Sequence, residues 1–449
     1  MRSIARNVST ARTCGELLAR IVQKRDPVET SRYFMDRAKH LGPTYIKIGQ
    51  FVSLRKDVVG DDVADVLAGL RDSVNPLPFD VVQSVVRRNG IFESFDEIDP
   101  APLASASIAQ VHSARIDGID VVIKVKRPDL ERQVAEDIDQ LRWLISVASS
   151  IPMVPKDTVA RLNSILSEFE LYRQEEMDFF QEMKNAKRFQ KMYRNDPSVV
   201  VPEIFDSLSS RDIIVMQFLP SSKIEKYAGD RVRLSQKIMR LFVSQLLYEG
   251  VVHGDPHTGN IGIDKEGRIV MYDFGSTIRV DRDYRTRLKL VISCLIGGNP
   301  KEMVKALRNL GIRIVDSKSA ESYMALYYKY VRTIDVNVFR PADPSMAGSM
   351  DVNSVDTIRP NPDAVPFEFD DTLIRLFRVF GMLEGICKEL NDDFDYFDIM
   401  TNFWDAFLLD EDFVRTKGAW DVSKSSTQSA SGAPKSSFSK KKRKWRKCF

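Results

Sequence analysis

Hydrophobic and polar residues follow two different periods along this chain, and the change of period separates its regions. The N-terminal part has the helical period, which predicts helices over residues 16–24, 28–54, 61–70 and 79–88. From Ile108 the residues alternate with period two, which predicts strands over Ile108–Ile116 and Ile119–Lys126. Asp117-Gly118 lies between these strands and is a strong hairpin signal, because both residues tolerate the positive φ angles of a tight turn.

After the hairpin the helical period returns. It predicts helices over residues 129–147, 158–193 and 231–248, and mostly helix over 281–413 apart from a loop at 340–366. Residues 212–218 have the apolar run of a buried strand, and residues 251–272 indicate short strands and loops. We therefore predict an α+β fold with a helical N-terminal extension (1–98), an N-lobe with inserted helices (99–220), a mostly helical C-lobe (221–421) and a disordered basic tail (422–449).

The composition is typical of a soluble globular protein, with 43% hydrophobic and 29% charged residues. No apolar stretch approaches the roughly 20 residues of a membrane span, so we expect no transmembrane span and only peripheral membrane contact. Four widely spaced cysteines argue against a disulfide framework and a zinc site. Arg2 and Arg6 precede the first acid, Glu16, which predicts either a transit peptide for a mitochondrion or plastid, or an ordinary basic first helix.

Charge is distributed unevenly along the chain. The net charge is +3, but nine lysines and arginines and no acid follow residue 421, so the rest of the chain carries −6. A block of like charge after a Ser-rich segment is expected to be disordered in water. The cations of Lys440–Lys447, together with Trp445 and Phe449, predict contact with an anionic membrane surface. The alternatives to membrane contact are nuclear import, a purely solubilising tail and nucleic-acid binding. We expect nucleic-acid binding least.

The strongest chemical signal is His253-Gly254-Asp255-Pro256-His257-Thr258-Gly259-Asn260, followed by Asp273-Phe274-Gly275. Transfer of a γ-phosphoryl group requires a carboxylate near the acceptor, oxygen ligands for Mg²⁺ and a cation against the phosphates. Asp255 and Asn260 have the spacing of the kinase catalytic loop, and Asp273 follows an apolar run as it does in the kinase D-F-G motif. We therefore predict that Asp255 orients the nucleophile and that Asn260 and Asp273 bind Mg²⁺.

A candidate for the phosphate-binding cation lies in Val121-Val122-Ile123-Lys124, which matches the lysine strand of kinases. Lys124 alternates with apolar neighbours, so its side chain is expected to face the cleft between the lobes. Asp178 and Glu182 are candidate partners for it, because residues four apart on a helix share one face. A solvated, charged helix face is the alternative interpretation of these acids.

Two features of ordinary protein kinases are missing from this sequence. The loop before the first predicted strand, Pro102–Gln110, contains no glycine, although a G-x-G-x-x-G loop normally covers the phosphates. Residues with a Cβ restrict the backbone, so we expect a different kind of phosphate contact from the alanine-rich loop, which is Ala104, Ser105, Ala106 and Ser107. No A-P-E sequence follows Gly275 at the usual distance, so the segment that docks peptides is not found.

Taken together, these motifs resemble those of the UbiB/ADCK family of atypical kinases, over about residues 41–397. The resemblance includes Leu41–Gln50, which is similar to the family's K-x-G-Q signature, the alanine-rich loop, the lysine strand and the E-x-D motif at Glu176 and Asp178. It implies a two-lobed protein-kinase-like fold. It also implies an atypical kinase or ATPase that uses ATP or ADP with Mg²⁺ in ubiquinone or other prenylquinone metabolism.

The resemblance further implies roles for single residues. Glu182 would pair with Lys124, and a helical extension would pack over the cleft where a peptide docks in other kinases. Glu176 and Asp178 would lie near the nucleotide, and we expect Lys47 and Gln50 to approach them and to gate the cleft against protein substrates. The predicted nucleotide site consists of Lys124, the alanine-rich loop and a hinge facing adenine, which is Met216, Gln217, Phe218 and Leu219.

The sequence also departs from the family pattern. Thr258 replaces the usual Pro and Gln217 replaces a common Glu, although neither change removes a phosphate or metal ligand. The C-terminal transmembrane segment of some bacterial members is not found. Two other functions stay open: a small-molecule kinase of the same fold, against which the alanine-rich loop and the K-x-G-Q segment argue, and a nucleotide-gated scaffold that handles lipid without transferase activity.

Overall fold

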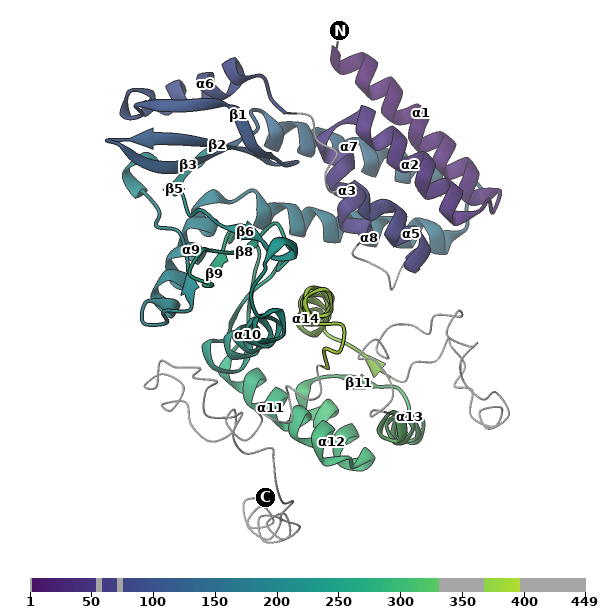
Figure 1. Cartoon of the computed structure of the whole chain (residues 1–449). Coiled ribbons are helices and arrows are strands. Elements are labelled where there is room, and N and C mark those ends of the chain that lie inside the picture. Colours follow the sequence, from purple (N-terminus) through teal and green to yellow (C-terminus); the bar gives the residue numbers. More distant parts are fainter. Residues whose placement is uncertain (1, 54–58, 71–75, 331–366, 396–449) are drawn as a thin grey trace. The chain divides into compact units, whose positions relative to one another are not determined.

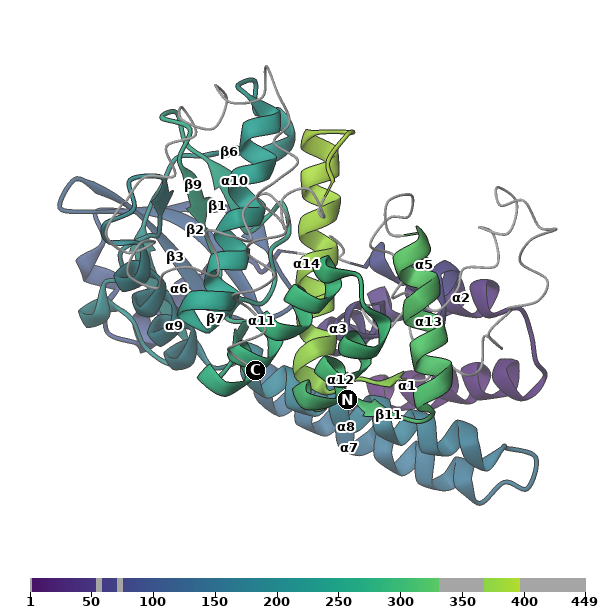
Figure 2. The same cartoon turned by 90° about the horizontal axis from the view of Figure 1, so that it is seen from below.

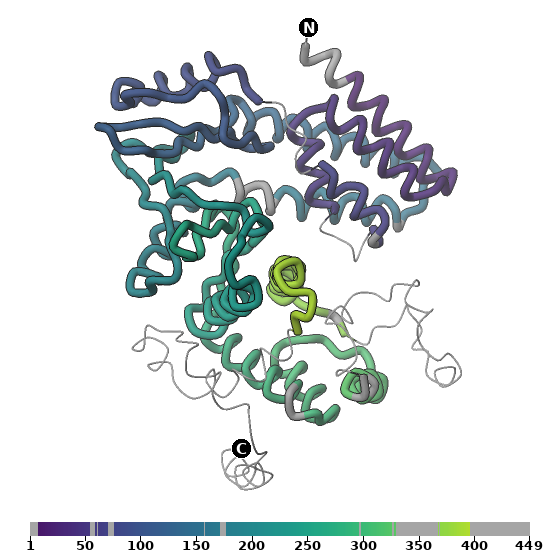
Figure 3. The backbone as a smooth tube through the Cα atoms, in the orientation of Figure 1, coloured from purple at the N-terminus to yellow at the C-terminus, as the bar shows by residue number. Residues whose placement is uncertain are grey.

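The structure is a computed structural model that describes residues 2–53, 59–70, 76–330 and 367–395 (Figures 1 and 3). Contacts between residues divide the chain at Leu409, and all of the described residues belong to the part before it. The predicted basic tail and the predicted loop at 340–366 lie outside the described residues. Within those residues, no helix is both long enough and apolar enough to cross a membrane.

The N-terminal extension is helical as predicted, but its helices have different bounds. They are α1 (Arg2–Val22), α2 (Pro27–Leu41), α3 (Pro43–Ser53) and α5 (Asp61–Ala68). The first helix was expected to begin at Glu16, but the residues before it are also helical. The single helix predicted over 28–54 is wrong, because Gly42 has a φ of 108° and Pro43 starts a new helix after it.

These N-terminal helices share one hydrophobic core. Its buried members come from α2, α3, α5 and the turn after α5: Ala38, Leu41, Tyr45, Ile46, Leu67 and Leu70. Helix α1 joins them through the buried hydroxyl of Thr10, which accepts a hydrogen bond from Tyr45 Oη at 3.3 Å. Helix α3, which carries Lys47 and Gln50, is therefore held on several sides by its neighbours.

The N-lobe contains a four-stranded antiparallel sheet in the order β1 (Glu97–Ser105), β2 (Ala109–Ile116), β3 (Ile119–Lys126) and β5 (Ile213–Gln217). The β2–β3 hairpin is confirmed, and Asp117 and Gly118 have φ angles of 49° and 76°. The prediction of a loop over Pro102–Gln110 is wrong at both ends, because residues up to Ser105 pair with β2 and β2 itself begins at Ala109. Helix α6 (Phe79–Arg88) packs its valines against β3 and β5, and the predicted boundary at residue 98 falls within β1.

Three helices follow β3 along the chain: α7 (Leu130–Ser149), α8 (Lys156–Glu176) and α9 (Phe179–Tyr193); all three are labelled in Figure 1. The first two form an antiparallel hairpin with its own core. The single long helix predicted over 158–193 is wrong, because the chain leaves helical geometry between Glu176 and Phe179. Asp178 is the N-cap of α9 and accepts the Gln181 amide at 3.0 Å.

The C-lobe is mostly helical, as predicted, with short strands around the motif residues. Its strands are β4 (Val199–Val200), β6 (Ser222–Lys223), β7 (Val251–His253), β8 (Ile261–Ile263), β9 (Ile269–Met271), β10 (Thr277–Arg279), β11 (Arg313–Ile314) and β12 (Phe367–Glu368). Its helices are α10 (Arg231–Ser244), α11 (Arg282–Gly297), α12 (Pro300–Leu310), α13 (Ser317–Tyr330) and α14 (Asp371–Leu390). Helix α14 packs along α10 (Figures 1 and 2).

Two helical glycines provide a test of this packing. A Cβ on Gly49 of α3 would lie 2.2 Å from Leu70 Cδ1 and 3.0 Å from Phe34 Cε1, both in the packed N-terminal helices. We expect Gly49→Ala to lower the free energy of unfolding by about 1–3 kcal/mol, as overpacking does. A Cβ on Gly381 of α14 would meet no atom within 4 Å.

The matched variant Gly381→Ala should therefore raise the free energy of unfolding by about 0.5–1 kcal/mol, because alanine is the better helix former. Denaturant unfolding of both variants measures the difference. Equal shifts of the same sign would contradict the close packing at Gly49.

Candidate active site

Lys124 is at the centre of the site. It lies in strand β3, where Val121 and Ile123 are fully buried in the sheet's core and Lys124 points to the opposite face. Its ammonium donates hydrogen bonds to Glu182 Oε1 at 2.7 Å and to Asp273 Oδ2 at 3.1 Å. One lysine of the N-lobe therefore contacts a carboxylate from α9 and a second carboxylate from the loop after β9.

The ammonium of Lys124 and the carboxylates of Glu182 and Asp273 stabilise one another in their ionised forms. Burial would favour a neutral lysine, but Asp273 and Glu182 outweigh it and raise the pKa of Lys124. Burial also opposes ionisation of Asp273, but Lys124 and the Gly275 amide outweigh it and lower the pKa of Asp273 to about 2. Lys124 and Asp273 are therefore both ionised at neutral pH, the states suited to phosphate and to a hard cation.

The backbone around Asp273 is anchored to α9. Asp273 has a φ of 50°, a left-handed conformation that is uncommon outside glycine and is best tolerated by aspartate and asparagine. Phe274 is buried with its ring centroid 5.1 Å from that of Phe189 and 5.5 Å from that of His253. Asn185 Nδ2 donates to the Phe274 carbonyl oxygen at 2.9 Å. The helix that supplies Glu182 thus also fixes the residue after Asp273.

His253 has a structural part in the same motif. It is fully buried, and burial lowers its pKa. Its Nε2 lies 3.0 Å from the Tyr272 carbonyl oxygen, which only accepts, so Nε2 carries the proton and Nδ1 accepts the Asp255 amide at 3.3 Å. The His253 amide donates to Gln245 Oε1 at 2.9 Å, from a π-helical turn at the end of α10. A neutral His253 therefore joins the backbone of Asp255 to the end of β9.

Asp255 itself is partly exposed, with 38% of its side chain accessible. Its carboxylate is therefore open to a substrate group, and His257 Nε2 lies 3.7 Å from Asp255 Oδ2. The preceding Gly254 is required by a close approach, because a Cβ there would lie 2.4 Å from Ser276 Oγ and 3.0 Å from the Ser276 carbonyl carbon. The Gly254 amide donates to the Ser276 carbonyl at 2.9 Å, which places the catalytic loop against the segment after Asp273.

Asn260 and Asp273 are brought to the same end of the β8–β9 hairpin. Ile261 pairs with Met271, and the Tyr272 amide donates to the Asn260 carbonyl oxygen at 2.8 Å. Asn260 Nδ2 donates to the Asp255 carbonyl at 3.1 Å, so the amide oxygen of this side chain is the end that is suited to a metal.

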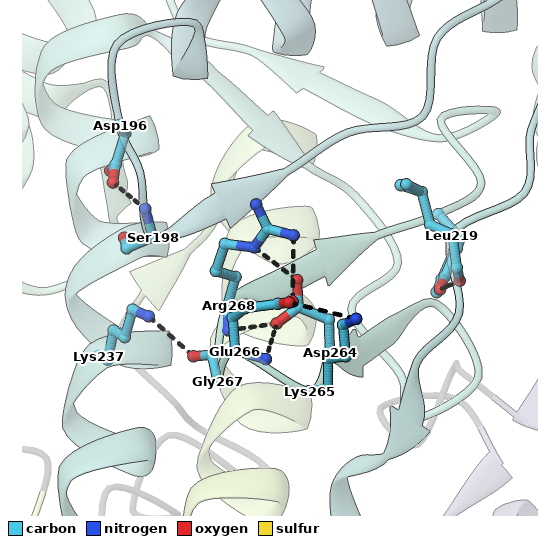
Figure 4. Close-up of polar contacts among 10 residues, drawn as sticks. Asp196, Ser198, Leu219, Lys237, Asp264, Lys265, Glu266, Gly267 and Arg268 are labelled. Carbon is cyan, nitrogen blue, oxygen red and sulfur yellow. Dashed lines mark hydrogen bonds and ion pairs between the residues drawn. The ribbon is translucent and has the colours of Figure 1, made fainter.

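The turn of this hairpin is held by a polar network (Figure 4). Asp264 accepts the Arg268 Nε at 2.6 Å, the Arg268 amide at 2.8 Å and the Glu266 amide at 3.1 Å. Burial opposes the charge of Asp264, but the hydrogen bonds from Arg268 outweigh it and lower the pKa of Asp264. Lys237 of α10 donates to the Gly267 carbonyl at 3.3 Å. The network defines the turn between Asn260 and Asp273 and ties it to the helical lobe.

The oxygen donors of Asn260 and Asp273 are of the kind that would fit Mg²⁺. Among the described side chains, no group of three or more His, Cys, Asp and Glu could hold a metal ion by itself. Mg²⁺ is usually held by one or two protein oxygens together with substrate phosphates and water. The Asn260 amide oxygen and the Asp273 carboxylate are two such oxygens, so these residues fit this ion.

The alanine-rich loop is supported by an arginine that the sequence analysis missed. Arg127 is buried, and burial lowers its pKa. Its Nε donates to the Ala106 carbonyl at 2.9 Å and its Nη2 to Ser105 Oγ at 2.9 Å. Ala104 is exposed and Ser107 is buried in the turn. A cation directly after the lysine strand was the available signal, but only the fold shows that it points to this loop.

The predicted hinge begins at the end of β5. Gln217 is exposed, and its backbone N–H donates to the backbone carbonyl of Glu203 at 2.8 Å. Met216 pairs with Val122 of β3, and the Phe218 amide donates to the Asp120 carbonyl at 3.2 Å. The carbonyl of Leu219 accepts Tyr272 Oη at 2.8 Å, which links the hinge to the residue before Asp273.

The described contacts do not bring the predicted gating residues together at one place. Lys47 lines a small cavity together with Ser107 of the alanine-rich loop and Met177. Gln50 Nε2 donates to the Leu70 carbonyl at 3.0 Å within the N-terminal helices, so no described contact joins it to a cleft carboxylate. Asp178 caps α9, one turn before Glu182 whose amide donates to its carbonyl at 3.0 Å, and is not part of one helix with Glu176. Glu176 ends α8, and its side chain lies outside the described residues.

Strand β3 also contacts the corner between α8 and α9, which is Met177 and Asp178. Lys126 is buried, and its ammonium donates to the Met177 carbonyl at 2.7 Å. Three cations at the end of β3 therefore make different connections. Lys124 contacts the two carboxylates, Lys126 contacts the corner between α8 and α9, and Arg127 contacts the alanine-rich loop. Lys126 was likewise missed by the sequence analysis.

Helix α14 reaches the catalytic loop from the C-lobe. Arg378 Nη2 donates to the Gly254 carbonyl at 2.9 Å, directly before Asp255, and Arg375 Nη2 donates to the Thr277 carbonyl at 3.3 Å. A helix from the C-terminal part of the described chain therefore supports the strands on both sides of the motif residues.

Comparison with known proteins agrees with this geometry. The chain is 28% identical over 403 residues to the protein named ACTIVITY OF BC1 COMPLEX KINASE 8, chloroplastic, from Arabidopsis thaliana, covering 82% of this chain and 53% of that protein. It is 32% identical over 253 residues to the probable protein kinase UbiB of Xylella fastidiosa, covering 53% of this chain and 46% of that protein. The chain thus spans about half the length of these curated relatives.

A solved structure of Rv3197 with erythromycin, from Mycobacterium tuberculosis, has the same fold, with a TM-score of 0.54 at 20% identity over 76% of this chain and 87% of that one. The model of the ABC1 atypical kinase-like domain matches residues 69–307. The two-lobed kinase-like fold and the resemblance to UbiB/ADCK proteins are therefore confirmed. Because this match takes in more than half of the sequence and includes both the lysine strand and the catalytic motifs, the chain belongs to the ABC1 atypical kinase-like family.

Proposed function

We propose that this protein binds Mg²⁺–ATP in the site around Lys124 and transfers or hydrolyses its γ-phosphoryl group. The observation that carries the proposal is the contact of one buried ammonium with carboxylates from both sides of the site, at 2.7 Å to Glu182 and 3.1 Å to Asp273. In kinases the lysine that binds phosphate and the aspartate that binds metal must be in place together. Kinase-type chemistry in general follows from the family; the nucleotide and the metal are our proposal.

Each residue has a role in this proposal that follows from its position. Lys124 would hold the α- and β-phosphates while Glu182 keeps it charged and oriented. Asn260 and Asp273 would hold Mg²⁺, which supplies positive charge against the β- and γ-phosphates when bound. Asp255, with its partly exposed carboxylate and its backbone fixed by His253, would accept a hydrogen bond from the attacking hydroxyl or water.

We further propose that the substrate is a lipid or another small molecule and not a protein. The A-P-E segment that supports peptide docking is missing, and α14 contacts the catalytic loop at Gly254. Lys47 of α3 also lines a cavity with Ser107 and Met177, beside the proposed phosphate site. The resemblance to prenylquinone-associated kinases supports a prenylquinone-related lipid as the chemical class.

A plastid is the proposed site of action. The Arabidopsis relatives ACTIVITY OF BC1 COMPLEX KINASE 8 and 7 are both named chloroplastic, and the basic N-terminal residues agree with an organelle address. A fluorescent fusion of the full chain in plant cells tests the address, and a purely mitochondrial signal would contradict it.

The metal assignment predicts that Asp273→Asn abolishes the Mg²⁺-dependent part of nucleotide binding, because a neutral amide is a weaker ligand for a hard cation. A thermal-shift titration with ATP, with and without Mg²⁺, measures the effect, and we expect at least a tenfold loss of apparent affinity. Asp212→Asn, at an exposed position at the edge of the sheet, is the matched control and should bind as the unmutated protein does. Unchanged Mg²⁺-dependent binding by Asp273→Asn would show that Asp273 is not a metal ligand.

The buried pair predicts strong coupling between Lys124 and Glu182. A double-mutant cycle with Lys124→Met and Glu182→Gln should give a coupling energy of about 1–3 kcal/mol in denaturant unfolding. Lys124→Met takes the ammonium away from the buried Glu182 carboxylate, and Glu182→Gln removes one of the two charges that offset the ammonium. The exposed pair Arg115–Asp120, at 3.2 Å with more than half of each side chain accessible, is the control and should couple by less than about 0.5 kcal/mol. Equal coupling in the two cycles would contradict the account.

The proposed exclusion of protein substrates predicts the outcome of a transfer assay. With labelled ATP, the full chain should hydrolyse nucleotide while leaving casein and histone unlabelled, because the peptide-docking segment is missing. A reference protein kinase in the same reaction provides the positive control. Robust labelling of either protein by this chain would overturn the proposed substrate class, while leaving the metal assignment untouched.

A further inference from the structure

One arginine of helix α14 contacts the peptide group that links Gly254 to Asp255. Arg378 Nη2 donates to the Gly254 carbonyl oxygen at 2.9 Å. The N–H of the same peptide group belongs to Asp255 and donates to Nδ1 of the buried His253 at 3.3 Å. Because a peptide group is planar, these two hydrogen bonds hold it at both of its polar ends. They therefore fix the backbone rotation directly before the Asp255 carboxylate.

The residue before Asp255 makes this support necessary. Gly254 has no Cβ that would limit its own backbone angles. A larger residue does not fit there, because a Cβ would lie 3.0 Å from the Ser276 carbonyl carbon. The backbone N–H of Gly254 donates to the Ser276 carbonyl at 2.9 Å, but this bond holds the preceding peptide group. A flexible residue before the proposed base therefore depends on its neighbours, and Arg378 supplies the hydrogen bond to its carbonyl.

Arg378 is not needed to hold α14 in place. The helix packs along α10 (Figure 1), and its buried apolar residues include Leu376, Val379 and Leu383. The Nε of Arg378 is buried and has no hydrogen-bond partner among the described residues. A buried donor without a partner lowers the stability of a fold. The place of Arg378 is therefore explained by its contact with the catalytic loop and not by the stability of the helix.

The charge of the guanidinium strengthens the contact. Arginine stays protonated in proteins, and a hydrogen bond from an ionised donor is about twice as strong as one between neutral groups. A second arginine, Arg375, lies one turn earlier on α14 and donates to the Thr277 carbonyl at 3.3 Å. Thr277 begins β10, and β10 pairs with β7, the strand that leads into the catalytic loop. Helix α14 therefore contacts both the loop and the strand beside it through arginines.

We propose that Arg378 is a positioning residue for the transfer step, which holds the Asp255 carboxylate within hydrogen-bond reach of the attacking hydroxyl or water. This inference rests on the proposed function and extends it to a helix outside residues 69–307, which the family model matches. Arg378 touches neither nucleotide nor metal in this assignment and acts through the peptide group before Asp255. Binding of Mg²⁺–ATP, which the proposed function assigns to other residues, should therefore not depend on Arg378.

The test compares Arg378→Met with Arg287→Met in the full chain. Arg287 is an exposed arginine of α11 and provides the matched control, which should turn over ATP as the unmutated chain does. Methionine keeps much of the apolar stem of arginine and removes all of its donors. We expect Arg378→Met to lower kcat by about tenfold or more, because small misplacements of a reacting group are costly, and to leave the Kd for Mg²⁺–ATP within about twofold. Arg378→Lys keeps a charged donor and should regain part of kcat.

Hydrogen exchange gives a second readout that does not require turnover. The backbone N–H groups of Gly254 and Asp255 should exchange faster in Arg378→Met, while those of α10 keep their rates. Unchanged exchange at these two residues would overturn the proposal, whether or not the chain turns over ATP. So would an unchanged kcat, or a joint fall of kcat, of Mg²⁺–ATP affinity and of the denaturant midpoint, since that result indicates a role in the fold as a whole. Absence of ATP turnover by the unmutated chain contradicts the proposed function alone, so the two failures are distinguishable.

Discussion

The structure of the site depends on one constraint: a lysine ammonium in strand β3 must be satisfied where little water reaches it. An unpaired buried charge costs several kcal/mol, so Lys124 requires its two carboxylates, at 2.7 Å and 3.1 Å. Glu182 reaches it because Asp178 starts α9 one turn earlier and Lys126 holds the corner before it. Asp273 reaches it because the β8–β9 hairpin returns the chain to Asn260.

The residue directly after the same strand holds the alanine-rich loop, which stands where other kinases have a glycine-rich loop. A glycine-rich loop approaches phosphates with its backbone, whereas here a buried arginine, Arg127, holds Ala106 and Ser105 in a fixed turn. The alanine-rich loop is therefore positioned from β3 and next to Lys47 of α3.

Local signals were sufficient for much of this fold. Asp117-Gly118 predicted the hairpin because its turn chemistry is local, and the family resemblance predicted the pair of Lys124 and Glu182. The contact of Lys124 with Asp273 was not predicted. The breaks at Gly42 and Asp178 were missed because the helical period continues on both sides of each break, so periodicity alone joins the segments. Arg127 and Lys126 were missed for a different reason. Each of them donates to a backbone carbonyl of a segment distant in the sequence, Ala106 for Arg127 and Met177 for Lys126, and no side-chain motif in a sequence records such a contact.

The central claim is that Lys124 stays bound to Glu182 while Asp273 becomes a metal ligand when nucleotide is present. The most direct measurement is a crystal structure of the full chain with Mg²⁺ and a non-hydrolysable ATP analogue. The account predicts the Asp273 carboxylate about 2.1 Å from Mg²⁺, the Asn260 amide oxygen in the same coordination sphere, and Lys124 in contact with both Glu182 and the phosphates. A nucleotide bound elsewhere, or a complex in which Lys124 and Glu182 have separated, would contradict it.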